Sequence, residues 1–325
     1  MARVHMKNFV DNPKAEIVGF CDVVVDRAKE CKREFGSNNS RFFADAHVMF
    51  EECQLDAVYS CVPPYAHGFE LEAIERNIPF FVEKPVDIDL KQAERIANAV
   101  EKKNLLTSVG YMNRYREGVR MARKLFIHEK PVLTVGGIVD RGICKRAGES
   151  QQSWWFRKEK SGGQLHEETS HTFDLARFIV GEVREVHAFA AGEIENVVLP
   201  AHSNIQLSSI VNLKFRNESV GSVWSMFLGD GDGEDISLSV YGDKTTALFR
   251  NWDHTLQLIE RGENHRQFAS EQNIFEIEDA AFVDAVATGN KTQIMCPYAD
   301  GLKTIEITLA ANKSIETGKP VSIPA

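Results

Sequence analysis

The sequence predicts an α/β protein in which a Rossmann-like parallel-sheet domain is followed by an α+β domain with an open, mostly antiparallel sheet. The chain has 325 residues, which is long for a single hydrophobic core. In its first third, short apolar runs alternate with helical patterns, as in βαβ units. After about Tyr115, strand-like segments follow one another directly. We therefore expect one domain over residues 1–114 and a second over residues 115–325.

The first domain is predicted to alternate helices and strands. A helix over roughly residues 2–11 precedes a strand over Ala15–Asp22 and a helix that Gly36 ends, since glycine is common just past a helix. The strand Leu55–Val62 stops at Pro63-Pro64, because proline cannot donate to a β-ladder. The remaining elements are a helix over 65–77, a strand over 79–83, a helix over 90–103 and a strand over 105–111.

The second domain is predicted to begin a new pattern in which strands alternate apolar and polar residues. Val211, Leu213 and Phe215 share one face of a half-buried antiparallel hairpin that turns at Asn217-Glu218. Further elements are expected as strands over 236–241, 247–250 and 255–260, and as helices over 275–287 and 299–316.

Composition limits the classes of function. The net charge of −9 argues against general nucleic-acid binding, which needs a basic face for phosphate contacts. No apolar run approaches the roughly 18 residues of a membrane span, so no membrane partner is expected. The first ten residues place charged and amide groups where a signal peptide needs an apolar stretch, which favours a cytoplasmic protein. The six cysteines form no C-x-x-C pair, so we expect reduced thiols and no metal cluster.

A helical segment after a glycine pair is predicted to carry an acid/base site. Over Ser161–Asp174, the spacing predicts one helix that places Glu167, His171 and Asp174 on a single stripe. Glu167 can then set the tautomer and basicity of the His171 imidazole, unless the two only form an ion pair on the helix surface. His166 lies five residues before His171, about 140° around a helix, whereas the zinc motif H-E-x-x-H needs four. Neither a zinc site nor a role for His166 is expected.

The strand over residues 79–83 is predicted to end at a second chemical group. It runs into Glu83 and Lys84, and open α/β sheets bind their ligands at the carboxyl ends of strands. An ammonium group in such a cleft can stabilise negative charge on a reacting oxygen, whereas the alternative is a surface lysine beside Glu83. We therefore expect Lys84 and His171 to converge on one pocket.

Taken together, these segments resemble the Gfo/Idh/MocA oxidoreductases over nearly the whole chain. The resemblance rests on the stretch Asp56–His67, the turn Glu83-Lys84-Pro85, the segment Gly162–Glu167 with His171 and Asp174, and the ending Gly318–Val321. It implies hydride transfer between NAD, less favourably NADP, and a sugar, an inositol or a sugar derivative. Glu167 and Thr169 depart from the resemblance, because the family commonly has Asp and Gly there.

The resemblance also implies roles for individual residues. Asp22 would bind the adenosine ribose, and its carboxylate favours NAD because it would repel a 2′-phosphate. The catalytic residues would be His171 as general base, Lys84 as the group that stabilises the alkoxide, and Glu167 as the residue that orients His171. The cofactor site would comprise Asp22, Cys61, Pro63, His67, Glu83, Lys84 and Asn113, and the substrate site Arg114, Trp155, Arg157 and His171. Structural roles are the alternative for Cys61 in the strand core, His67 at a helix end and Trp155 between domains.

The beginning of the chain departs from a complete dinucleotide-binding unit. Such a unit opens with a strand and a G-x-G-x-x-G turn, whereas residue 1 here is already predicted to lie in the following helix. The first strand is central in the usual order, so its neighbours would lack a partner and the cofactor pyrophosphate would lack its amide cradle. We interpret the chain as a version of a longer protein that is shortened by about 10 to 15 residues.

Three classes of function stay open. The first is a dehydrogenase or reductase, the second is an NAD-recycling lyase or glycosidase of the same fold, and the third is a non-catalytic ligand sensor. In each the partner would be a small sugar or polyol. The apolar face with Val211, Leu213 and Phe215 offers a surface for a homodimer or homotetramer, unless helices of the same chain cover it.

Overall fold

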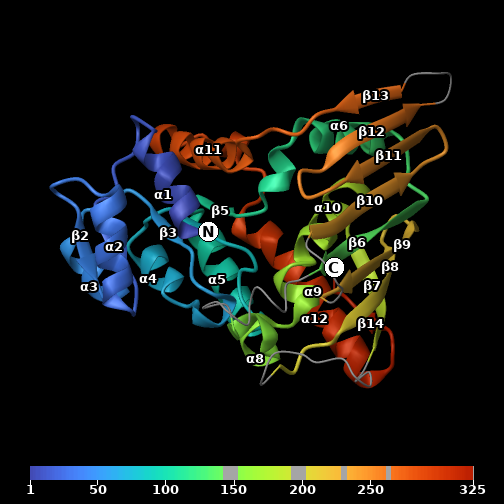
Figure 1. The fold of residues 1–325 in the computed structure, drawn as a ribbon, viewed down its shortest axis with the longest axis horizontal. Coiled ribbons are helices and arrows are strands. Elements are labelled where there is room, and N and C mark those ends of the chain that lie inside the picture. Colours follow the sequence, from blue (N-terminus) through green and yellow to red (C-terminus); the bar gives the residue numbers. More distant parts are fainter. Residues whose placement is uncertain (142–152, 192–202, 228–232, 261–264, 325) are drawn as a thin grey trace.

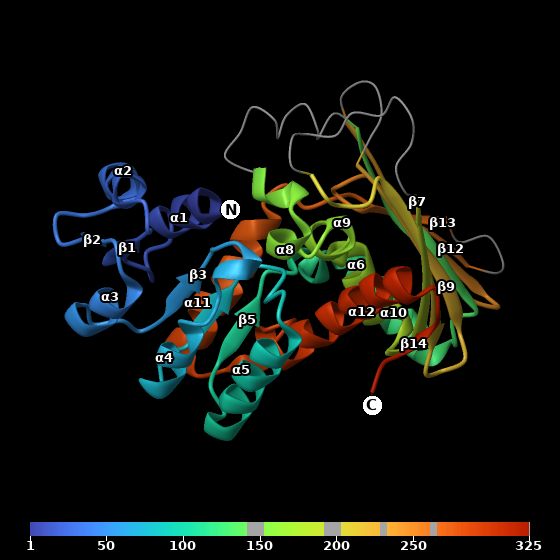
Figure 2. The same ribbon diagram turned by 90° about the horizontal axis from the view of Figure 1, so that it is seen from below.

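The computed structural model describes residues 1–141, 153–191, 203–227, 233–260 and 265–324. They form a Rossmann-like α/β domain and an α+β domain built on one large sheet, which lie side by side (Figures 1 and 2). This confirms the predicted fold class. In the part of the chain that is described, no helix is long and apolar enough to cross a membrane.

The first domain consists of short parallel strands separated by helices. Its elements are α1 (Ala2–Val10), β1 (Gly19–Cys21), α2 (Val25–Phe35), β2 (Arg41–Phe43), α3 (Ala46–Glu52), β3 (Val58–Ser60), η1 (Pro64–Ala66), α4 (Glu70–Glu75), β4 (Phe80–Val82), α5 (Leu90–Lys103), β5 (Thr107–Val109) and η2 (Met112–Tyr115). Every predicted strand and helix of this domain is present, but each strand is only three residues long. The elements β2 and α3 lie where the pattern predicted none.

Side-chain chemistry explains where these helices begin and end. Asp89 caps α5 by accepting a hydrogen bond from the Lys91 amide, and Asn104 ends it in the left-handed conformation that asparagine tolerates. Gly36 ends α2 as predicted, but with extended backbone. Glycine is needed there because a Cβ atom would lie 2.5 Å from the carbonyl oxygen of Lys32.

The parallel strands form two separate sheets. β1 pairs with β2, whereas β4 lies between β3 and β5. Among the described residues no strand joins the two sheets. Phe80, Phe81 and Val82 of β4 are fully buried, because helices cover both faces of the central strand.

The second domain consists of one large sheet that is covered by helices on one face only. Its elements are α6 (Glu117–His128), β6 (Leu133–Arg141), η3 (Ser153–Phe156), α8 (Lys158–Ser161), α9 (Gln164–Glu167), α10 (Ser170–Val180), β7 (Val183–Ala191), β8 (Ser208–Phe215), β9 (Val220–Met226), β10 (Gly233–Tyr241), β11 (Thr245–Arg250), β12 (Thr255–Glu260), β13 (His265–Phe268), α11 (Ile274–Thr288), η4 (Lys291–Gln293), α12 (Tyr298–Thr317) and β14 (Val321–Ser322). The sequence predicted no element at α6, β6, β7 or β13.

The large sheet has the strand order β13-β12-β11-β10-β6-β9-β8-β7-β14. Its neighbouring strands are antiparallel except for β6 and β9, and the β8–β9 hairpin confirms the predicted one. Val211, Leu213 and Phe215 are buried in a core that α10 and α12 complete (Figure 2). The face that the sequence offered for self-association is therefore covered by helices of the same chain, and the opposite face is open.

The end of the chain returns to the first domain. α11 packs against α1, and its Phe282 joins a buried cluster with Phe81 and Leu106 (Figure 1). Tyr298, at the start of α12, packs on Phe80. Residues 115–325 were expected to form the second domain, but residues after 273 also complete the core of the first domain.

Candidate active site

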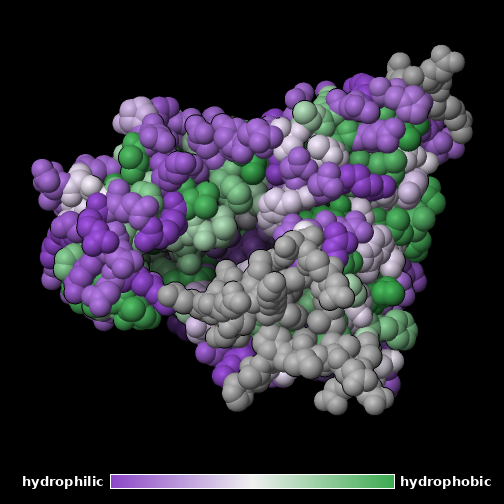
Figure 3. All heavy atoms as spheres, in the orientation of Figure 1, coloured by the Kyte–Doolittle hydropathy of each residue, from purple (hydrophilic) through white to green (hydrophobic). Residues whose placement is uncertain are grey.

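Lys84 follows β4 and reaches across to the second domain. Its Nζ atom donates hydrogen bonds to the backbone carbonyl oxygen of Glu167 at 2.7 Å and to Glu167 Oε1 at 3.2 Å. The side chain is only 13% exposed, so it is not a surface lysine. The molecular surface is hollowed between the two domains (Figure 3). The strand end therefore presents a partly buried ammonium group at the domain junction.

The segment predicted as one helix is broken in two. α9 ends at Glu167 and α10 begins three residues later, because the Thr169 amide donates to the carbonyl of Gln164, five residues back. The break separates Glu167 from His171, and the Glu167 carboxylate pairs with Lys84 instead. The predicted single stripe, and with it the prediction that Glu167 orients His171, is wrong.

His171, in the first turn of α10, is a buried imidazole. Tyr111 and Trp252 contact it edge to face, with ring centroids 5.9 Å and 5.4 Å away. Burial lowers the pKa of His171 well below its ordinary value, and the nearby Lys84 ammonium lowers it further. Its Nδ1 atom is buried and has no hydrogen-bond partner among the described residues. The ring is therefore neutral at physiological pH and can accept a proton.

The Glu167 carboxyl is buried beside Lys84. Burial raises its pKa above the ordinary value, and the Lys84 ammonium opposes this increase. Its Oε2 atom has no hydrogen-bond partner within the described segments. Glu167 thus holds Lys84 through two oxygens and keeps a third for a hydrogen-bond donor.

Arg114 and Asp174 form part of a buried ion network. The Arg114 guanidinium donates to both carboxylate oxygens of Asp174, at 2.8 Å and 2.6 Å, and it also pairs with Asp300. Arg177 binds Asp300 as well, at 2.9 Å. Although burial opposes it, the two guanidinium groups hold the pKa of Asp300 well below its ordinary value. The structure contradicts the prediction that Arg114 binds substrate, because the whole side chain is buried in this network.

Three of the predicted cofactor residues lie at the ends of β1 and β3. Asp22 accepts a hydrogen bond from the Val24 amide through Oδ1 at 2.8 Å, which leaves its other oxygen for a ligand. Pro63 is half-buried before η1. Cys61 is a free thiol whose pKa is raised by burial, so it stays protonated. Only Asp22 among these three offers a charged group.

His67 and Glu83 turn their side chains inward. His67 is fully buried, and its Nδ1 atom lies 2.7 Å from Glu70 Oε1. Glu83 is buried as well, and its Oε1 atom lies 2.9 Å from Nε2 of His5. These contacts hold the strand-end turns in place, and the paired Glu83 carboxylate faces His5, not a ligand site, whereas Nε2 of His67 is buried without a partner among the described residues.

Asn113, after β5, is the strand-end residue with an unused donor. Its Oδ1 atom accepts a hydrogen bond from Nε of Arg116 at 2.7 Å. Its Nδ2 atom is buried and has no partner in the described part of the chain. A buried donor without a partner is costly, so this amide is suited to a ligand oxygen.

The remaining sequence candidates lie around α8 and α9. Trp155 packs with Phe156, Ile205 and Phe227, which all belong to the second domain, so this cluster does not lie between the domains as the alternative expected. Arg157 is half-buried at the start of α8.

His166, for which the sequence suggested no role, is buried. Its Nδ1 atom lies 2.7 Å from Thr308 Oγ1, and its Nε2 atom lies 2.8 Å from the carbonyl oxygen of Asp87. Both ring nitrogens are thus occupied, and burial lowers the pKa of His166 to about 4.

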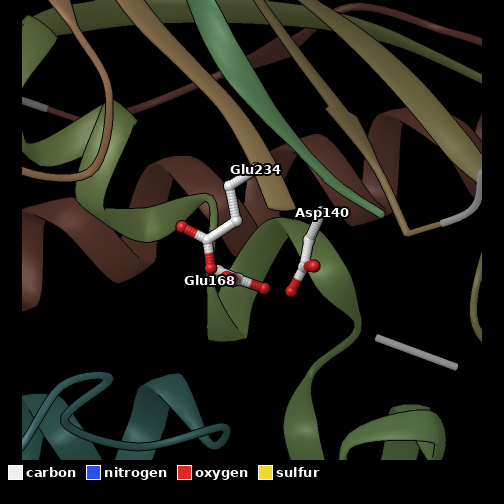
Figure 4. A group of neighbouring side chains, drawn as sticks. All are labelled: Asp140, Glu168 and Glu234. Atoms are coloured by element: carbon white, nitrogen blue, oxygen red, sulfur yellow. The ribbon is translucent and has the colours of Figure 1, made fainter. Parts of the chain in front are cut away.

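Three carboxylates from separate elements meet near the helix break. Asp140 of β6, Glu168 and Glu234 of β10 lie together (Figure 4), and each offers an oxygen within 4.8 Å of the others. Burial, and next the charge of Asp140, raise the pKa of Glu168 to about 8, so Glu168 carries a proton at neutral pH. No spacing in the sequence marks this group, because the pairing of β6 with β10 brings Asp140 to Glu234, and Glu168 comes from the break between α9 and α10.

Sequence reasoning missed His5, the residue that joins three parts of the chain. Its ring nitrogens lie 2.7 Å from Asp279 of α11 and 2.9 Å from Glu83 after β4. These partners are 274 and 78 residues away along the chain, so no local pattern could identify them.

Two family profiles together match most of the chain. Residues 1–111 match the profile described as "Oxidoreductase family, NAD-binding Rossmann fold". Residues 139–323 match the profile described as "Oxidoreductase family, C-terminal alpha/beta domain".

Individual relatives are similar over nearly their full length. The scyllo-inositol 2-dehydrogenase (NAD(+)) of Bacillus subtilis (strain 168) is 25% identical over 331 residues, covering 98% of this chain and 92% of the relative. The myo-inositol 2-dehydrogenase of Thermotoga maritima is 23% identical, and the match covers 98% of this chain and 95% of the relative. The solved structure of levoglucosan dehydrogenase with NADH and levoglucosan has a TM-score of 0.87 at 21% identity, covering 100% of this chain and 97% of that one. This structural likeness establishes the fold.

Proposed function

Because the chain belongs to the Gfo/Idh/MocA family of oxidoreductases, we propose that it is an NAD-dependent dehydrogenase or reductase acting on a hydroxyl or keto carbon of a sugar, an inositol or a related polyol. The observation that carries the proposal is the position of Lys84: its ammonium reaches from the first domain to Glu167 of the second, and its charge lowers the pKa of the buried His171 imidazole. The inositol and levoglucosan dehydrogenases among its relatives support the same substrate class.

Residues at the strand ends fit a nicotinamide dinucleotide. Asp22 offers one carboxylate oxygen to ribose hydroxyls and would repel a 2′-phosphate, which favours NAD over NADP. The unpaired Nδ2 donor of Asn113 suits the carboxamide oxygen of the nicotinamide. Calorimetric titration of the 325-residue chain with NAD tests this fit directly.

The pocket residues divide the chemistry of alcohol oxidation between them. When bound, the nicotinamide supplies the hydride acceptor. Lys84 binds the substrate hydroxyl oxygen and stabilises its negative charge as the proton leaves. His171 is neutral before the reaction and accepts that proton. Glu167 holds the Lys84 ammonium through two hydrogen bonds, so the donor is positioned before the substrate arrives.

Absorbance of NADH with a panel of inositols and sugars tests the proposal. Net NADH formation with at least one of them is the expected result. Product formation without net NADH would indicate an NAD-recycling lyase or glycosidase instead. Binding of NAD and a sugar without any turnover would indicate a ligand sensor.

We also propose that the chain forms a homodimer or homotetramer through the open face of its large sheet. Phe189 of β7 and Ile210 of β8 are 57% and 51% exposed there. Together with Trp224 and Met226 they line a shallow apolar cavity of about 480 Å³. Contiguous apolar surface of this kind is typical of protein interfaces. Light scattering should give a dimer or tetramer for the wild type and a monomer for Ile210→Lys, and a monomeric wild type would contradict the proposal.

A further inference from the structure

The turn between β11 and β12 places Trp252 against the His171 imidazole. Their ring centroids are 5.4 Å apart and their planes meet at 85°. Tyr111, the other aromatic ring on His171, is 1% exposed, whereas Trp252 is 36% exposed. Of these two rings, Trp252 is therefore the one that a ligand from solvent can reach.

Two residues of this turn adopt the left-handed backbone conformation. Asn251 and His254 both have positive φ, 62° and 50°, although neither is glycine. The His254 amide donates to the carbonyl oxygen of Asn251 at 3.1 Å, and the Asn251 amide donates to that of Ile236 at 2.9 Å. These hydrogen bonds fix the backbone on both sides of Trp252.

The His254 side chain fixes the turn from within. It is buried, and its Nδ1 atom lies 2.9 Å from the carbonyl oxygen of Trp252. A carbonyl oxygen only accepts, so Nδ1 carries the hydrogen in this contact. Burial lowers the pKa of His254 to about 4, so the ring stays neutral and the contact is kept at physiological pH. Trp252 is thus a preorganised platform beside His171.

We propose that Trp252 is a specificity-determining residue whose indole ring supports the C–H face of a cyclic polyol beside His171. This inference rests on the proposed function. A pyranose or cyclohexitol presents a rigid patch of C–H groups, and removing that patch from water against a flat ring is favourable. An acyclic polyol has no such rigid face and loses more rotational freedom when it is bound. The site therefore selects cyclic over acyclic polyols.

Kinetics of Trp252→Ala and Trp252→Phe test this role. With myo-inositol as the cyclic and sorbitol as the acyclic polyol, Trp252→Ala should lower kcat/KM for the cyclic compound by roughly 10-fold or more, mainly through KM. The value for the acyclic compound should change little, and Trp252→Phe, which keeps an aromatic ring, should retain most of the preference. An unchanged cyclic-to-acyclic ratio in Trp252→Ala would overturn the inference.

Binding measurements separate this inference from the proposed function. If the wild type forms no NADH with any polyol, the proposed function fails. Calorimetric titration with myo-inositol in the presence of NAD then still tests Trp252, because the inference requires weaker binding by Trp252→Ala than by the wild type and Trp252→Phe. Equal affinities in all three proteins would overturn it.

Discussion

The buried imidazole of His5 makes the stability of the fold depend on pH above neutrality. His5 joins α1 to Asp279 of α11 and to Glu83 beside Lys84. Burial lowers its pKa, but the hydrogen bonds to Asp279 and then to Glu83 outweigh burial and raise the pKa from 6.5 to about 10. The folded protein therefore keeps this proton over a pH range in which the unfolded chain releases it.

The size of the effect follows from this difference in pKa. Because the pKa is raised on folding, the stabilisation is fully present below pH 6.5 and is lost as the pH rises through about 10. The free energy of unfolding should fall by about 1.4 kcal/mol for each pH unit in this window. Over the whole window the loss is roughly 5 kcal/mol, an upper value for a group coupled to two carboxylates.

Urea unfolding of the wild type and His5→Gln between about pH 6 and pH 9 measures this contribution. The variant should be less stable near pH 6, and its deficit should shrink by about 1.4 kcal/mol per pH unit. Asn8→Ala is a matched control, because Asn8 donates to the same Asp279 at 2.7 Å but does not titrate. A deficit of His5→Gln that stays constant with pH, like that of the control, would refute the reasoning.

Three further predictions concern charged groups at or near the domain junction. Lys84→Met and His171→Ala should each lower kcat by roughly 10²-fold or more, measured as NADH formation at saturating substrate, and an unchanged kcat would count against their roles. Arg114→Met leaves Asp174 buried without its partner, so it should reduce the free energy of unfolding by about 3–5 kcal/mol; a loss below about 1 kcal/mol in urea unfolding would show that the network matters little. The pKa of Glu168 is raised to about 8, so its contribution to stability decreases as the pH rises from 4.5 to about 8. Glu168→Gln should therefore gain stability relative to the wild type over that range, and a difference independent of pH would disagree with the raised pKa.

Local patterns were enough to place Lys84. The alternation of apolar runs and helices predicts parallel strands, and the residue after a buried strand then lies at the ligand-binding edge of the sheet. The structure has Lys84 at that edge, in contact with Glu167. The helical spacing around His171 was less informative, because spacing cannot show that the chain turns at Thr169.

Charged residues were harder to interpret than apolar ones. Arg114, Glu83 and His67 all follow strands in the sequence, which suggested ligand contacts. In the structure each pairs with a buried partner: Arg114 with Asp174 and Glu83 with His5, which lie far away in the chain, and His67 with Glu70, three residues further on. A charged side chain after a strand can point into the pocket or into the interior, and its sequence neighbours do not distinguish the two.

The sequence by itself determined the fold class, the positions of most strands and helices in the first domain, the family and the strand-end lysine, because these depend on periodicity and on residues close together in the chain. The tertiary structure alone decided which carboxylate meets Lys84 and which face of the large sheet is covered. It also decided that Trp252 contacts His171 and that His5 binds Asp279 and Glu83. Those outcomes depend on contacts between segments far apart in the chain, and the energy of burying a charge or a ring depends on what surrounds it in space.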